Sequence, residues 1–114
     1  LNLLASFSIS PTYLICTKMK YINLLKMSKS VSLKLQNKLS PENFKNILHD
    51  YYEKNNSVDE YLLKYQDKWI WCFYPGENNN IDIQFSNDFT LDERISFLCD
   101  LKKIITYSID AGYI

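Results

Sequence analysis

The stretch KWIWCFYPGENNNIDIQF, Lys68 to Phe85, carries the clearest structural pattern in this chain of 114 residues. Every position from Trp69 to Tyr74 is apolar or aromatic, so both faces of a strand here would be apolar. Such a strand belongs in the interior of a sheet. After the turn-forming residues PGENNN, residues 81–86 alternate apolar and polar side chains, which predicts a second, half-exposed strand.

The pattern leaves open which face of this interior strand lies in the core. One face carries Trp69, Trp71 and Phe73, and the other carries Ile70, Cys72 and Tyr74. Because large aromatic side chains dominate small cores, we expect the two tryptophans to face the core. The alternative is an outer aromatic surface framed by polar residues, which is typical of a protein-binding hot spot.

Earlier in the chain, residues 30–36 alternate apolar and polar side chains and predict a half-buried strand. Ser40 followed by Pro41 is a typical helix start, and the apolar stripe after it predicts a helix through Tyr51. A second, short helix is predicted over residues 57–65, because a serine and a glutamate there have the spacing of a capping box.

A long helix is predicted at the end of the chain. Thr90 and Glu93 form a second capping box, an apolar stripe runs on to Ile109, and Gly112 stands where a helix stop is expected. The predicted order is therefore β-α-α-β-β-α. This order indicates a two-layer α+β domain, with a three-stranded, mainly antiparallel sheet and three helices on one face.

The first 26 residues differ from the rest. They contain three lysines and no acidic residue, and Met27 reads like a natural start. Their positive charge follows the apolar residues, whereas a secretory signal carries its charge first. We favour translated upstream sequence for residues 1–26. A degraded leader or a real extra element of the fold are the alternatives, and residues 27–114 form the single predicted domain.

Charge excludes one class of partner. The whole chain has 13 basic and 13 acidic residues, and all three lysines of the first segment lie outside the predicted domain. The acidic excess of the domain is concentrated between Glu77 and Asp100, where Arg94 is the one basic residue. Such a surface repels nucleic acid and attracts a basic protein.

Residue types also limit the chemistry. Two glycines are too few for a phosphate-binding loop, and three scattered cysteines suit neither a zinc site nor a disulfide framework. The single histidine, His49, lies one helical turn from Glu53, and two ligands are too few for a catalytic metal site. We therefore expect no catalytic residues, no metal, no cofactor and no membrane span in the domain.

The expected function is that of a small, non-catalytic cytoplasmic module that docks a basic protein partner. Immunity proteins, antitoxins and phage-borne inhibitors belong to this class of compact acidic protein. A self-association module that forms a homodimer is the alternative, and a small enzyme with an unrecognised site is the third possibility. The predicted binding residues combine the aromatic strand with the acidic hairpin: Trp69, Trp71, Tyr74, Glu77, Asp82, Gln84 and Asp88.

Overall fold

The computed structural model describes residues 29–76 and 78–113, with the backbone alone for residues 110–113. The expectations for residues 1–26 and for Glu77 lie outside this part of the chain. The elements, in chain order, are β1 (Ser30–Leu35), α3 (Pro41–Ile47), β2 (Tyr52–Asn55), β3 (Glu60–Tyr65), β4 (Lys68–Phe73), β5 (Asn80–Phe85), α4 (Leu91–Lys102) and β6 (Tyr107–Tyr113).

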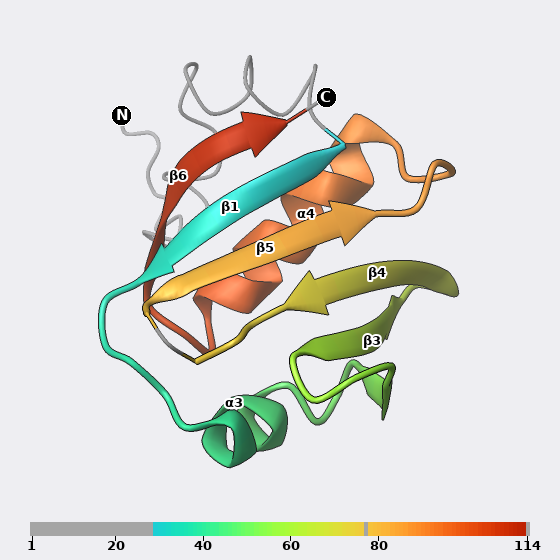
Figure 1. Cartoon of the computed structure of the whole chain (residues 1–114). Coiled ribbons are helices and arrows are strands. Elements are labelled where there is room, and N and C mark those ends of the chain that lie inside the picture. Colours follow the sequence, from blue (N-terminus) through green and yellow to red (C-terminus); the bar gives the residue numbers. More distant parts are fainter. Residues whose placement is uncertain (1–28, 77, 114) are drawn as a thin grey trace.

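The strands form one antiparallel sheet in the order β2-β3-β4-β5-β1-β6. Figure 1 shows α4 behind the sheet, and α3 below β3, on the side of the sheet where β2 is the edge strand. The predicted three-stranded sheet with three helices is therefore wrong, because the described residues form six strands and two helices. The domain is a small globular α+β fold whose second layer is mainly α4.

The helix predicted over residues 57–65 is instead a turn and strand β3. Tyr61, Leu63 and Tyr65 alternate into the core, and Val58, which the helical stripe would bury, is 80% exposed in the turn. The turn that follows β3 has a positive φ at both of its central residues, Gln66 and Asp67. This backbone matches the twist of a two-residue hairpin and joins β3 to β4.

The predicted long final helix is also wrong in its second half. Helix α4 ends at Lys102, and the chain returns as strand β6 along β1. Gly112 is no helix stop, since it lies in β6 opposite Val31. The pairing of β6 with β1 satisfies backbone groups that a continued helix would have satisfied internally, so tertiary pairing decides between the two structures.

Two of the three predicted helix starts, at Ser40 and Thr90, are confirmed, whereas the capping box expected at Ser57 starts no helix. The Ser40 side chain accepts a hydrogen bond from the backbone N–H of Asn43, with Pro41 in the first turn of α3. In α4, the Thr90 hydroxyl accepts from the N–H of Glu93, and the Glu93 carboxylate accepts in return from the N–H of Thr90. These bonds pair donors that the first turn of a helix leaves open.

The core lies mainly between the sheet and α4, and α3 adds Phe44 to it. It is rich in aromatic rings that meet edge to face, such as Phe97 with Tyr65 and Phe44 with Tyr61. Polar tips of buried tyrosines find partners at the margin of the core. The Tyr65 hydroxyl donates to Asp100 at 2.8 Å, and the Tyr74 hydroxyl bonds both the C=O and the N–H of Leu39.

Candidate functional site

Strand β4 turns its larger aromatic side chains away from the core. Trp69 is 38% exposed and Phe73 is 43% exposed, and Trp71 is half-buried between them. We call these three side chains the aromatic ridge, and the sheet surface opposite α4 the outer face. The other three side chains of this stretch, Ile70, Cys72 and Tyr74, are buried. The expectation that the tryptophans face the core is therefore wrong.

The register of β4 with its neighbours explains this choice of face. Cys72 pairs with Tyr61 of β3 and with Ile83 of β5, and both of these side chains are buried. Side chains directly opposite each other in an antiparallel pair share a face. The buried residues of β3 and β5 therefore carry Ile70 and Cys72 into the core with them, and the aromatic ridge points outward.

Three cross-strand rows make up the outer face. Trp69 lies opposite Lys64, whose Nζ atom is 5.2 Å from the centroid of the indole ring. Trp71 lies between Leu62 of β3 and Gln84 of β5. The third row is acidic, since Phe73 lies between Glu60 of β3 and Asp82 of β5.

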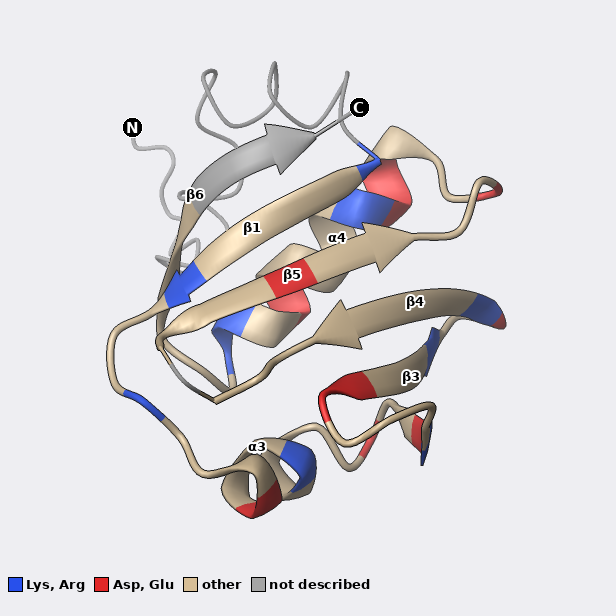
Figure 2. Cartoon of the chain, in the orientation of Figure 1, with Lys and Arg blue, Asp and Glu red and all other residues tan. Residues whose placement is uncertain are grey.

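We call Glu60 and Asp82 the acidic pair. Figure 2 shows their negative charges at the start of β3 and in the middle of β5, on either side of β4. The positive charge of Lys64 lies near the opposite end of the aromatic ridge. The outer face is therefore negatively charged at the Phe73 end of β4 and positively charged at the Trp69 end.

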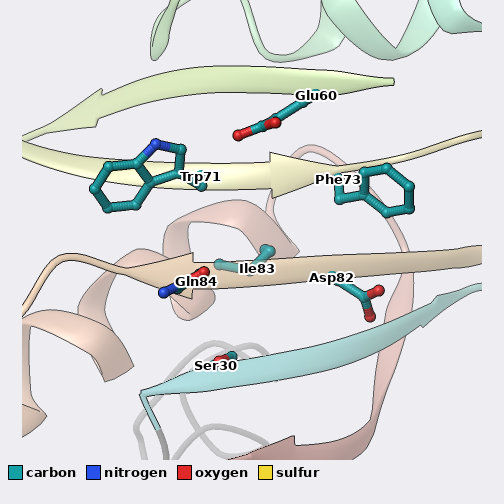
Figure 3. A pocket seen from close by; sticks show the side chains of 7 residues that line it. All are labelled: Ser30, Glu60, Trp71, Phe73, Asp82, Ile83 and Gln84. Atoms are coloured by element: carbon teal, nitrogen blue, oxygen red, sulfur yellow. The ribbon is translucent and has the colours of Figure 1, made fainter. Parts of the chain in front are cut away.

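A cavity of about 430 Å³ opens on the outer face (Figure 3). Trp71 and Phe73 both stand on β4 above it, and the Glu60 side chain points toward the space between them. Asp82 projects from β5 next to Phe73, and Gln84 lies below Trp71. The lining residues are Ser30, Glu60, Trp71, Phe73, Asp82, Ile83 and Gln84.

The predicted binding residues divide between several places. Trp69, Trp71, Asp82 and Gln84 lie together on the outer face. Tyr74 lies on the core side, 1% exposed, and cannot contact a partner there. Asp88 lies in the loop between β5 and α4, where its carbonyl oxygen accepts a hydrogen bond from Lys68.

Sequence reasoning omitted four of the seven residues that line the cavity, Ser30, Glu60, Phe73 and Ile83, and the sequence held a signal for two of them. Phe73 is two residues after Trp71 in β4, so the two side chains lie on the same face, and this spacing was sufficient to predict Phe73 as a binding residue. Glu60 was interpreted as the capping residue of a helix, although it begins β3 and faces outward. The alternation of Tyr61, Leu63 and Tyr65 would have placed Glu60 on the opposite face of a strand.

The groups most often used in catalysis are placed as follows. His49 is exposed after α3, and its ring bonds the carbonyl oxygen of Asn46 and the carboxylate of Asp50. Burial raises the pKa of the Cys72 thiol, so little thiolate is present at neutral pH. Within residues 29–76 and 78–109, no three side chains of His, Cys, Asp or Glu converge in a way that would hold a metal ion.

Comparison of the chain with protein-family models, with curated proteins and with solved structures finds no significant match. Neither α3 nor α4, the helices of the described residues, has the length and apolar character of a segment that crosses a membrane. The outer face and its cavity are thus the features from which a function is argued.

Proposed function

We propose that this chain is a small, non-catalytic protein-binding module whose outer face docks a basic protein partner. The observation that carries the proposal is the cavity between Trp71, Phe73 and the acidic pair. Anchors of this kind, aromatic at the centre and polar at the rim, dominate the binding energy of protein interfaces.

The exposure of the aromatic ridge supports the proposal. Large aromatic side chains that stand together on a sheet surface lose more apolar area to a partner than any other residue type. Trp69 and Phe73 are both more than a third exposed, and Trp71 lies between them on the same strand. This is a contiguous apolar strip, unlike a single exposed leucine or valine, and such strips mark interaction sites.

Charge supports a basic partner. Among the described residues, no group forms an ion pair or a hydrogen bond with the Asp82 carboxylate, and the Glu60 carboxylate accepts one long bond of 3.4 Å from Asn56. A cation from a partner would therefore meet two carboxylates whose own fold does not neutralise them. By analogy of class alone, the biological role we propose is that of an immunity protein, an antitoxin or a phage-borne inhibitor in the cytoplasm.

Affinity capture with the full chain tests this proposal. The bait is incubated with nuclease-treated lysate of the native cells, next to a Phe73→Ala, Asp82→Asn double variant and a Glu42→Gln, Glu53→Gln control. The control removes two exposed acidic charges from residues that do not line the cavity. We expect a basic protein that binds the wild type and the control, and that is lost with the folded double variant.

The captured protein must then bind again as a purified component. We expect its dissociation constant to rise with salt, because carboxylate pairing across an interface is screened. If every captured protein binds the double variant as well as it binds the wild type, or if the reconstituted complex is insensitive to salt, the proposal is wrong.

Self-association is a second candidate, favoured by the opposite charges at the two ends of the outer face. Two outer faces that pack about a two-fold axis perpendicular to β4 would place Lys64 of one copy opposite Glu60 of the other. Sedimentation analysis of the purified chain separates the candidates. A dimer that Lys64→Glu dissociates would support self-association, whereas a monomer at all concentrations would exclude it.

A further inference from the structure

The third row of the outer face has a geometry that selects for a particular kind of cation. Phe73 lies between Glu60 on one neighbouring strand and Asp82 on the other. Adjacent strands lie about 4.8 Å apart, so the Cα atoms of the two acidic residues are about 10 Å apart with Phe73 between them. The two carboxylates therefore border an aromatic surface from opposite sides.

A cation that contacts both carboxylates must be wide, flat and able to lie against aromatic rings. The guanidinium group of arginine is planar, stacks on aromatic faces and has five N–H donors that point in several directions. The ammonium group of lysine is compact and strongly hydrated, so it suits a single carboxylate. Charge-assisted bonds to carboxylates and the attraction of a cation to an aromatic face act together in such a site.

The cavity also offers room and further acceptors. Its volume of about 430 Å³ lies within the range of sites that enclose a small ligand, and one arginine side chain is smaller than most such ligands. Gln84 and Ser30 line the side next to Trp71, and their side chains can accept or donate further hydrogen bonds.

We propose that the outer face binds an arginine side chain of its partner, with the guanidinium group stacked against Trp71 and Phe73 and hydrogen-bonded to Glu60 and Asp82. This inference rests on the proposed function and names the chemistry of that same site. Lys64, at the Trp69 end of the ridge, then excludes a second cation there and fixes the direction in which the partner lies along β4.

Short peptides test the inference without the natural partner. The probes are acetyl-Gly-Arg-Gly-amide and the same peptide with lysine or with citrulline, which keeps the shape of arginine and lacks its charge. The ¹⁵N-labelled full chain is titrated, and the indole N–H signals of Trp69 and Trp71 are followed by NMR. We expect the arginine peptide to shift the Trp71 signal, the lysine peptide to bind about fivefold more weakly, and the citrulline peptide to have no effect.

Isosteric variants locate the site. Glu60→Gln and Asp82→Asn remove charge and keep shape, and each should weaken the arginine peptide about fivefold or more, as for loss of one charge-assisted hydrogen bond. The Glu42→Gln, Glu53→Gln control should bind it as the wild type does. Unchanged NMR spectra away from the cavity show that each variant is folded.

Each other outcome overturns the inference and leaves the proposed function to the capture experiment. Equal affinity for the lysine and arginine peptides would show a general cation site. Equal shifts with the citrulline peptide would show that charge has no part in binding. No shift with any peptide would exclude an arginine site, and shifts that depend on protein concentration alone would show that a second copy occupies the face.

Discussion

The two faces of strand β4 have nearly the same apolar content and opposite environments. Ile70, Cys72 and Tyr74 are at most 1% exposed, whereas Trp69 and Phe73, on the other face, are more than a third exposed. The large aromatic side chains, which an argument from size would bury first, are thus the ones that reach the solvent. Apolar content alone does not decide which face of a strand becomes core.

The neighbouring strands decide it. Side chains of β3 and β5 alternate between buried and more exposed positions, and their register with β4 places Ile70 and Cys72 in the buried rows. The outer face then receives the polar residues of the neighbours together with the aromatic ridge. This mixture of aromatic and charged residues distinguishes the outer face from the core face, and the following changes measure the difference.

Ile70→Ala should have the largest effect. Ile70 is fully buried, so the change removes buried apolar atoms and leaves a cavity, at a cost of about 2–5 kcal/mol in the free energy of unfolding. Chemical denaturation followed by tryptophan fluorescence measures this cost. Ile70→Val is the matched control and should cost about 0.5–1.5 kcal/mol. Wild-type stability of Ile70→Ala would show that this face of β4 is not core.

Tyr74→Phe should have the next largest effect. The Tyr74 hydroxyl donates to the carbonyl oxygen of Leu39 at 2.7 Å and accepts from its N–H at 2.9 Å. Without the hydroxyl, both backbone groups of a half-buried residue lose their partner, at a cost of about 1–3 kcal/mol. The ring remains packed against Phe44, so circular dichroism should show an intact fold. A cost near zero would mean that water replaces the hydroxyl.

The stability contributed by the ion pair between Lys68, at the start of β4, and Glu93 should be lost in acid. Glu93 accepts hydrogen bonds from Lys68 at 2.6 Å and from the backbone N–H of Thr90, and these bonds lower its pKa. A lowered pKa in the folded state gives stability that is present above the ordinary value of about 4.3 and is lost as the pH falls through the folded value. The stability difference between wild type and Glu93→Gln should therefore shrink with acidification below that pH.

Denaturation curves at neutral pH and in acid measure this difference. Lys68→Met is the matched control, since it removes the same ion pair from the other side. Its difference from wild type should shrink over the same pH range. A difference that stays constant in acid would show that Glu93 titrates alike in the folded and unfolded states.

Phe73→Ala should have the smallest effect on stability. Phe73 is 43% exposed on the outer face, and surface substitutions of this kind change the free energy of unfolding by about 0.5 kcal/mol or less. The same denaturation experiment measures it, with Ile70→Ala as the reference. A loss as large as that of Ile70→Ala would contradict the distinction between the two faces of β4, since Phe73 would then act as a core residue.

Local sequence signals predicted the starts of both helices, α3 and α4, and three of the strands. Caps at Ser40 and Thr90 depend on hydrogen bonds within four residues, so they can be recognised without knowledge of the fold. Strands β1, β4 and β5 have six residues each with little competing helical character. Where the apolar residues follow only the helical or only the strand period over several residues, the sequence was sufficient to predict the element.

The segments that form β3 and β6 were predicted as helices because their apolar residues fit both the helical and the strand period. Tyr61, Leu62 and Tyr65 suit one face of a helix, while Tyr61, Leu63 and Tyr65 suit one face of a strand. Asp67 takes a positive φ that glycine or asparagine usually marks, so the hairpin turn was not recognised. For the candidate site, the decisive information was the pairing of distant strands, which single-sequence patterns do not contain.

The position of β1 in the sheet has a consequence for biosynthesis. Strand β1 is made before every other described element, yet its two neighbours are β5 and β6, and β6 is made last. One edge of β1 therefore has no partner until β5 has been made, and the other has none until β6 has been made. Pairing between such distant segments slows folding. A nascent chain of this protein therefore presents an unpaired β1 strand to chaperones until β5 emerges, and an unpaired edge of β1 until β6 emerges.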